Sequence, residues 1–404
     1  MPYASWAEYW WDVVTGPSGL VAQVVEGLEQ DRSVILRVPR DLPWRHEMRS
    51  VISTRLQGEL EAANLVVDDV DVAEDLAANA DAWSDVGRWL LDRYALRDAR
   101  LGFRGGDVAR YLRAKGVLAN RVVWVKGLDA RVLPAWESFC QAWHSRGLAD
   151  GLFVVEVPVD VCPVTNERET SGSVTIVDYA AHVNDYSAQL FCGTMLDADA
   201  PDLSTVRKRY LAAVLTHVCH GDVETAALLI DRYQAGERNL RHALESVADE
   251  LPLRGNAPTA GDPHSSASAS APGHPLAAVR RGDWSSVRLR VWQAQLEVLF
   301  PRIEAERLRI VDTLAPELWH LIGRGLPQYD VEVTNSRDVE LGTLVFLMAK
   351  RDVDGERLLY VHDRGMRDRI HLLRDCRNLL AHGDCCSPKQ VDQLLEVPDD
   401  IYTS

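Results

Sequence analysis

The sequence predicts an α/β domain with a mainly parallel sheet, followed by an all-α domain. Up to about residue 177, short runs rich in valine and isoleucine alternate with segments of helical periodicity, a pattern typical of parallel sheets. From about residue 203 onward, helical periodicity dominates. A stretch rich in serine, alanine and proline near residues 263–272 cannot bury a core and separates the two parts. The length of 404 residues allows two domains or a little more.

The expected strands are short apolar runs bounded by turn-forming residues. They lie at residues 33–38, 65–67, 121–125, 152–157 and 174–177. Helices are expected between them at residues 44–63, 81–94, 106–115 and 133–145. Strands connected in this way by helices predict a three-layer α/β domain over residues 1–200.

The remaining chain is expected to form a helical appendage, a flexible linker and a helical domain, at residues 201–252, 253–281 and 282–404. In the last domain a long helix begins near Asp283 and runs to Leu314, and Pro301 should kink or split it. A second helix covers about 338–350, and a short hairpin, with a strand at 358–361, occupies about 352–362. A third helix begins near Arg364, and a last one covers about 388–396.

The end of the third helix carries the residues with the most informative chemistry. Arg377 and His382 lie five positions apart, and Gly383 is a natural helix stop that places His382 in the last turn. Helix carbonyl groups there favour a protonated imidazole. Arg377 is suited to hold an RNA phosphate, His382 to move protons at the 2′-hydroxyl or the leaving oxygen, and Asn378 to orient either. The alternative is that His382 caps helix carbonyls and Arg377 is a solvated charge.

The charge balance limits how RNA is bound. The net charge of −16 argues against a broad basic surface, so any RNA site must be local. Five arginines near the motif either form such a local anion site or belong to a helix face of ion pairs with neighbouring aspartates: Arg364, Arg367, Arg369, Arg374 and Arg377.

The segment Arg377-Asn378-Leu379-Leu380-Ala381-His382 resembles the motif of HEPN domains, which are small helical bundles common in prokaryotic conflict systems. Four helices with the motif at the end of the third are similar to the HEPN arrangement. The resemblance covers roughly the last 120 residues. It implies a metal-independent ribonuclease that works as a homodimer, with the two motifs meeting across a two-fold axis.

The order of elements in the first domain resembles that of P-loop ATPases of the AAA or STAND type. A phosphate loop needs glycines and a lysine, whereas residues 39–46 contain neither and include two prolines. The strand that should end in an acid is followed instead by Lys126 and Gly127. The resemblance therefore implies a degenerate P-loop NTPase-like fold without ATPase activity. Arg40, Arg45 and His46 either bind an anion or are surface charges.

The remaining features indicate a soluble protein of the cytoplasm. Seven scattered cysteines suggest reduced thiols. The sequence shows no signal peptide and no apolar run long enough to span a membrane. We expect no metal site and no cofactor, because the cluster at residues 217–220 lacks a second ligand pair at suitable spacing.

Two functional hypotheses follow. In the first, the chain is an anti-phage defence effector whose C-terminal HEPN dimer cuts RNA, while the pseudo-ATPase domain senses a signal or docks a protein partner. In the second, the chain is a non-catalytic assembly subunit of a defence complex, and the HEPN bundle serves only for dimerisation.

Overall fold

The chain forms two compact units. The sheet unit comprises residues 1–191, 221–228 and 251–272, and the helical unit comprises residues 192–220, 229–250 and 273–404. The computed structural model describes residues 4–59, 65–73, 85–162, 172–251, 274–322, 333, 335–351, 353 and 355–396.

The sheet unit is built on five parallel strands in the order β2-β3-β4-β1-β5. At the centre, Ile35 of β1 lies opposite Val155 of β4 on one side and Ile176 of β5 on the other. The bounds are β1 Ser33–Val38, β2 Val66–Asp71, β3 Arg121–Lys126, β4 Leu152–Pro158 and β5 Val174–Asp178. All five predicted strands and their parallel arrangement are confirmed.

Burial explains why these runs form strands in these places. The β1 strand is buried along its whole length, and β4 is buried up to Val157, as near-continuous apolar runs in a covered parallel sheet should be. The edge strand β2 is partly exposed and carries Asp68 and Asp69. Arg121 of the neighbouring β3 forms an ion pair with Asp68. Polar residues are thus placed on an edge, where solvent reaches them.

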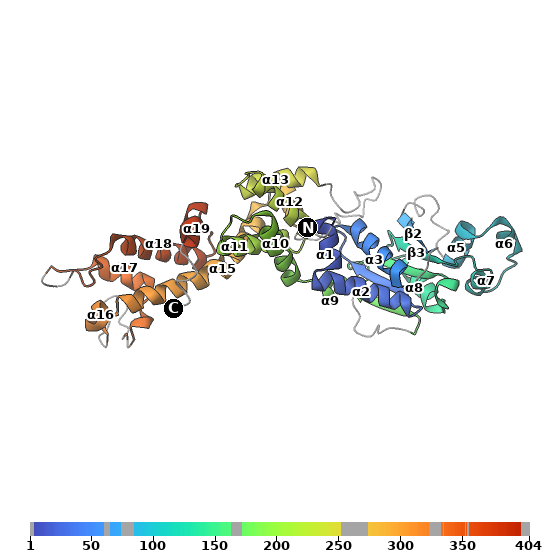
Figure 1. The fold of residues 1–404 in the computed structure, drawn as a ribbon, viewed down its shortest axis with the longest axis horizontal. Helices are drawn as coiled ribbons and strands as arrows, with labels where there is room; N and C mark the ends of the chain where they lie inside the picture. The colour runs from blue at the N-terminus through green and yellow to red at the C-terminus, as the bar shows by residue number, and fades with distance from the viewer. Residues whose placement is uncertain are drawn as a thin grey trace. The chain divides into compact units, whose positions relative to one another are not determined.

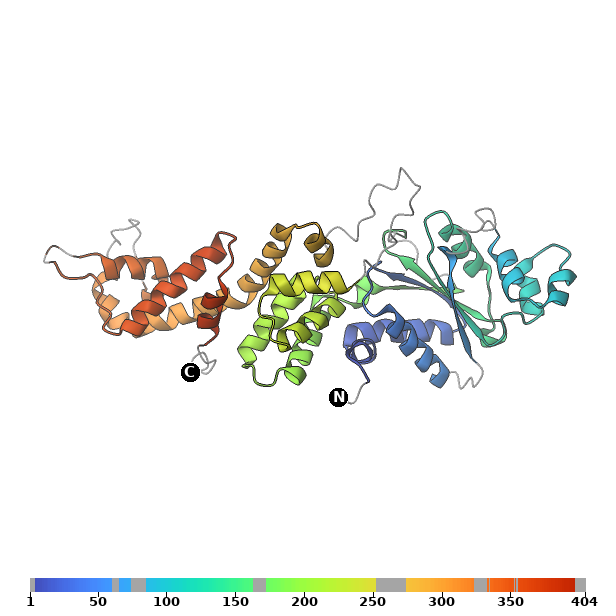
Figure 2. The ribbon, with the colours of Figure 1, turned by 90° about the horizontal axis from the view of Figure 1, so that it is seen from above.

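Helices cover both faces of the sheet. Figures 1 and 2 show α2 and α3 on one face and α8 on the other, so the unit has three layers. Gly27 lets α2 approach β1 closely, because an added Cβ atom would lie 2.9 Å from the side chain of Val34. The helices of this part are α1 Trp6–Asp12, α2 Thr15–Glu29, α3 Arg45–Glu59, α5 Val86–Tyr94, α6 Arg97–Gly102, α7 Val108–Ala114, α8 Leu133–Ala142, α9 Tyr179–His182 and the first half of α10 Asp185–Asp199, whose residues 192–199 belong to the helical unit.

The predicted helices of the first domain correspond to α3, α5, α7 and α8. Asp85 and Asp107 cap the N-termini of α5 and α7 with their side chains, which fixes where these helices begin. Helix α8 ends at Ala142, earlier than predicted, and the indole of Trp143 donates a hydrogen bond to the carbonyl of Gly151. Residues 60–63 and 81–84 of the predicted helices lie outside the described residues.

Helices from two separate parts of the sequence make up the helical unit. Leu299 and Ile303 of α15 share one buried core with Leu344 of α17 and Leu373 of α18, and Val206 of α11 belongs to it too. The helices are α11 Thr205–Cys219, α12 Val223–Gln234, α13 Leu240–Glu250, α14 Pro275–Arg280, α15 Trp284–Thr313, α16 Ala315–Leu318, α17 Leu341–Ala349, α18 Arg364–Ala381 and α19 Pro388–Leu395. Of α12, residues 229–234 belong to this unit and residues 223–228 to the sheet unit.

Helix α15 differs from the prediction, because it runs through Pro301 as one helix of 30 residues and is not split. Pro301 lies on the exposed side, where water can reach the carbonyl that the proline ring leaves without a helical donor. Leu299 and Ile303, on either side of it, are fully buried. Packing on both sides of the proline therefore holds the helix together.

The domain boundaries also differ. Helices α11 and α13 belong to the helical unit together with the C-terminal helices, and not to a separate appendage. Residues 275–280 of the predicted linker form α14, whose Leu276 and Val279 are buried, and Arg280 donates hydrogen bonds to the carbonyl of Ala248 in α13. An apolar helix packed on α13 cannot act as a linker. Residues 253–273 lie outside the described residues.

The predicted strand at 358–361 is wrong. Leu359 and Val361 are buried and Tyr360 is exposed, so the alternation is real, but among the described residues of this segment the pairing is a single antiparallel bridge between Arg351 and Arg357. Leu359 instead donates its backbone N–H to Leu347 of α17. In the described parts of the chain, no helix combines the length and apolar character needed to cross a membrane.

Candidate functional site

The candidate site lies at the C-terminal end of α18. Asp363 caps the start of this helix by accepting a hydrogen bond from the backbone N–H of Gly365. Ile370, Leu373 and Leu380 form its buried side. The helix begins at Arg364 and ends at Ala381, as predicted, and Gly383 follows with a positive φ of 80°.

The carbonyl groups in the last turn of α18 are bound by groups other than the His382 side chain. The backbone N–H of His382 donates to Asn378, and that of Asp384 donates to Leu379 at 2.8 Å. From α15, the indole of Trp292 donates to the carbonyl of Leu380, also at 2.8 Å. The sequence alternative in which the imidazole caps these carbonyls is therefore not what the structure shows.

His382 and Asn378 are both exposed and four residues apart, so they lie on one side of the helix. Within the described part of the chain, neither side chain has a hydrogen-bond partner. An imidazole and an amide on one face, both free to bind, can contact a single ligand together.

Unlike His382 and Asn378, Arg377 already has a partner. Its guanidinium forms an ion pair with Glu340 at 3.0 Å, and Glu340 is the N-cap residue of α17. Its Nε atom is buried and, among the described residues, finds no acceptor. Five residues turn a helix through about 500°, so Arg377 and His382 leave the axis of α18 about 140° apart. One copy of the helix therefore presents these two groups in different directions.

Ion pairs and backbone contacts engage all five arginines near the motif. Arg369 is half-buried and pairs with the buried Glu306 of α15 at 2.6 Å. The side chain of Arg367 donates to backbone carbonyls at residues 361 and 362. Arg364, Arg374 and Arg377 pair with Asp368, Asp375 and Glu340. Of the two sequence interpretations, the structure favours the ion-paired helix face.

Side chains of α15 hold the segment after His382 in place. The side-chain oxygen of Gln295 accepts from the backbone N–H of Cys386 at 2.7 Å, and its amide group donates to the carbonyl of the same residue at 3.2 Å. Arg288 pairs with Asp384 at 2.6 Å. The Cys376 and Cys386 thiols lie together beneath this turn, where a hydrogen bond from Cys386 lowers the pKa of Cys376. The turn after His382 is thus held in place by contacts to α15.

In the sheet unit, residues 39–46 do not form an anion site. Arg45 donates to the carbonyls of Pro39 and Arg40, at 3.1 and 2.9 Å. A phosphate cradle presents backbone N–H groups to an anion, whereas this loop presents carbonyl groups to a cation. Arg40 pairs with Asp160 at 2.8 Å, and His46 is exposed. The contacts of Arg40 and Arg45 favour the surface-charge interpretation over anion binding.

Glu156 of β4 neutralises the arginines near this loop. It is 2% exposed and accepts hydrogen bonds from Arg45, Arg49 and the indole of Trp124. The single carboxylate of Glu156 thus binds the guanidinium groups of both Arg45 and Arg49. The signal for it in the sequence was one acidic residue within the apolar run Leu152–Pro158.

Sequence reasoning missed the partners of the motif residues. Glu340, the partner of Arg377, lies 37 residues before it in the sequence. Trp292, whose indole donates to the carbonyl of Leu380, lies 88 residues before Leu380. No spacing rule connects them. The usable signal was an acidic residue directly before the apolar run Leu341–Ala349, where a helix N-terminus favours a carboxylate.

Comparisons with known proteins give little further information. No protein-family model matches the sequence, and no curated protein is significantly similar to it. Among solved structures, the Aeropyrum pernix ORC1 protein in complex with DNA aligns with 98% of this chain and 97% of that chain, with 11% identity and a TM-score of 0.34. A similarity at this level carries no argument about this chain.

Proposed function

We propose that the protein is a metal-independent endoribonuclease of the HEPN type, acting in anti-phage defence as a homodimer through its helical unit. The observation that carries this proposal is the end of α18, where an exposed imidazole without a partner among the described residues lies on the side of Asn378 and about one and a half turns beyond Arg377. RNA cleavage by the 2′-hydroxyl needs a phosphate-binding cation and a proton-transfer group.

The proposed reaction is a transesterification. His382 of one copy takes the proton of the ribose 2′-hydroxyl, whose oxygen attacks the neighbouring phosphorus. His382 of the second copy protonates the 5′-oxygen as its bond to phosphorus breaks. The products carry a 2′,3′-cyclic phosphate and a 5′-hydroxyl. Arg377 releases its ion pair with Glu340 and binds the phosphate in its place. Asn378 orients the ribose.

The angular separation of the two residues supports a site built from two copies. Arg377 and His382 leave α18 about 140° apart, so a phosphate held by Arg377 is more readily reached by His382 of another copy. One copy also has only one imidazole here, whereas the reaction needs a base and an acid. Both arguments call for a dimer.

The sheet unit supports a sensing or docking role without nucleotide hydrolysis. Arg45 occupies the loop in which a phosphate would have to lie, and Glu156 holds it there. The unit keeps a parallel sheet and a rigid, ion-paired loop, which suit it to bind a protein partner.

One observation favours the assembly-subunit alternative. The ion pair between Arg377 and Glu340 occupies the cation on which cleavage depends. If the phosphate cannot displace Glu340, the helical unit serves only for dimerisation.

The proposal is tested on a synthetic single-stranded RNA in the presence of EDTA. We expect cleavage products with 2′,3′-cyclic phosphates, and no cleavage of a matched RNA with 2′-deoxyribose at the cleaved position. The matched RNA is the control, because it differs only in the attacking hydroxyl. Cleavage that requires a divalent cation, or products with free 3′-hydroxyls, would contradict the proposal.

A further inference from the structure

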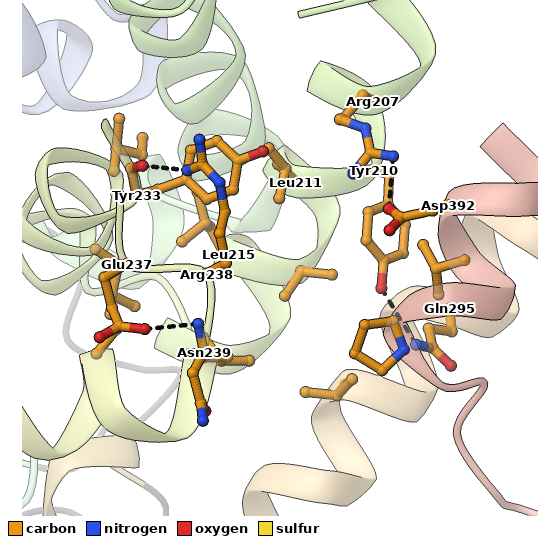
Figure 3. Close-up of a pocket in the computed structure, with 18 of the residues that line it drawn as sticks. Arg207, Tyr210, Leu211, Leu215, Tyr233, Glu237, Arg238, Asn239, Gln295 and Asp392 are labelled. Atoms are coloured by element: carbon orange, nitrogen blue, oxygen red, sulfur yellow. Dashed lines mark hydrogen bonds and ion pairs between the residues drawn. The ribbon is translucent and has the colours of Figure 1, made fainter. Parts of the chain in front are cut away.

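A second candidate site lies elsewhere in the helical unit. A cavity of about 980 Å³ opens between α11, α12 and α13 on one side and α15 and α19 on the other. Figure 3 shows most of the side chains that line it. Small-molecule sites have about 300–1,000 Å³, so this cavity is large enough for a cofactor-sized ligand.

One wall of the cavity is largely apolar. It is formed by leucine and isoleucine side chains of α11 and α12, of which all but Leu211 are buried: Leu211, Leu215, Leu229 and Ile230. A ligand with an apolar surface would gain free energy chiefly by covering Leu211, the least buried of them.

The charges around the cavity are already matched. Arg207 pairs with Asp392 at 2.6 Å. Arg238 donates to the backbone carbonyl of Tyr233, and its guanidinium lies 3.6 Å from the centre of that ring. Among the described residues that line the cavity, the arginines and the acids are equal in number: Arg207, Arg238, Arg241, Glu237, Asp392 and Glu396. A charged ligand would therefore find no net attraction.

The hydroxyl of Tyr210, on the lining, has bonding capacity left. The hydroxyl of Tyr210 accepts a hydrogen bond from the amide of Gln295 at 3.2 Å, and burial raises the pKa of Tyr210 to about 12, so the hydroxyl keeps its proton. No described residue accepts that proton. Both functional groups of Gln295 are used by Tyr210 and Cys386. Tyr210 is thus a donor for an acceptor atom on a ligand.

We infer that this cavity binds an uncharged, mainly apolar small molecule that carries a hydrogen-bond acceptor, such as the carbonyl of a heteroaromatic compound. The apolar wall selects the body of the molecule, the matched charges exclude ions, and the Tyr210 hydroxyl orients the acceptor. This site is separate from the RNA site, and its assignment does not depend on ribonuclease activity.

Ligand binding in this cavity should strengthen the hydrogen bonds that hold the turn after His382. Tyr210 contacts Gln295, and Gln295 holds both backbone groups of Cys386, four residues after His382. An acceptor bound to Tyr210 strengthens this chain of hydrogen bonds by polarisation. The amide of Cys386 should therefore exchange its hydrogen more slowly when the cavity is occupied.

The probe for the test is Nile red, a neutral heteroaromatic dye with a carbonyl acceptor whose fluorescence rises and shifts to the blue in apolar sites. Titration of the full chain should give saturable binding of about one dye per chain. Leu211→Trp, which fills the cavity from α11, should weaken binding about tenfold or more. Leu289→Trp is the matched control, because it adds the same side chain at a position that is 53% exposed, and it should bind the dye as wild type does.

Tyr210→Phe tests the hydrogen bond from Tyr210 to the acceptor atom of the ligand. Because this variant loses only one oxygen, it should fold even if Leu211→Trp disturbs the packing. Loss of one hydrogen bond should weaken dye binding by about 2- to 12-fold. Binding that does not saturate, or that a folded Leu211→Trp variant leaves unchanged, would overturn the site. Wild-type affinity of Tyr210→Phe would overturn the assignment of an acceptor-bearing ligand.

Discussion

At the end of α18, His382 and Arg377 differ in how ready they are to bind RNA. The imidazole of His382 is exposed, whereas Arg377 is already paired with Glu340. A phosphate must compete with this carboxylate. The ion pair therefore acts either as a restraint on the site or as a device that positions Arg377.

Glu340→Gln separates these two roles. If Glu340 competes with phosphate, removing its charge should strengthen RNA binding by about 1.4- to 5-fold, because partly exposed ion pairs contribute about 0.2–1 kcal/mol. The measurement is fluorescence anisotropy with a labelled RNA. Asp338→Asn is the control, since it removes the same charge from an exposed residue nearby without touching Arg377. Weaker binding by Glu340→Gln would show that Glu340 positions Arg377 instead.

The site residues could be predicted only in part. The boundaries of α18 follow from local signals, namely its leucine spacing and Gly383. The ion pair with Glu340 and the indole of Trp292 at Leu380 depend on how α15 and α17 pack against α18. Such contacts between distant segments leave no periodic pattern in one sequence.

At the scale of single elements, the strand ends of the sheet unit depend on Glu156. This carboxylate is buried on β4 and binds Arg45 and Arg49 of α3. Removing it would leave two guanidinium groups beside a buried cavity. The position of α3, and with it the loop at 39–44, therefore rests on this one side chain.

Glu156→Ala should lower the free energy of unfolding of the sheet unit by about 3 kcal/mol, the lower end for a broken buried ion pair, because Arg45 still reaches solvent. Asp160→Ala breaks the exposed pair with Arg40 and should cost about 0–1 kcal/mol. Urea unfolding followed by tryptophan fluorescence compares the two. Equal effects of both substitutions would refute the structural role of Glu156.

The same loop leads to a prediction about nucleotides. Because its carbonyl groups surround the guanidinium of Arg45, Mg-ATP should not bind tightly and should not be hydrolysed. Isothermal calorimetry with Mg-ATP should show no binding in the micromolar range. A micromolar dissociation constant would mean that the loop rearranges, and the pseudo-ATPase interpretation would fail.

The elements themselves were largely predictable where propensity and burial agree. Buried apolar runs predicted β1 and β4, because only a covered parallel sheet accommodates such runs, while the edge strand β2 is partly exposed. The prediction failed at residues 358–361, where buried Leu359 and Val361 pack on helices without a partner strand. It also failed at Pro301, where packing on both sides outweighs the missing hydrogen bond.

At the scale of the whole chain, the helical unit combines residues on both sides of the predicted linker. Tyr210 of α11 bonds Gln295 of α15, Arg207 pairs with Asp392 of α19, and His217 pairs with Glu297. A sequence that passes a Ser/Ala/Pro-rich stretch suggests separate domains on each side of it. The helices that follow the sheet instead complete the C-terminal core, which only three-dimensional packing reveals.

Limited proteolysis tests this organisation. Elastase should cut within residues 255–273, whose composition favours cleavage. The two fragments should stay together in gel filtration and separate only in denaturant, because α11 and α15 share contacts and a core. Fragments that separate in native buffer would contradict this division of the chain.

The central claim is that the end of α18 cleaves RNA, and replacing His382 tests it most directly. His371 is the matched control, since it is an exposed histidine on the same helix, eleven residues earlier. With purified full-length protein, RNA and EDTA, His382→Ala should cleave at least about 100-fold more slowly than wild type, while His371→Ala should keep wild-type activity. Both variants should unfold at the wild-type temperature, because both side chains lie in solvent. If His382→Ala cleaves as fast as wild type, the proposed site is wrong.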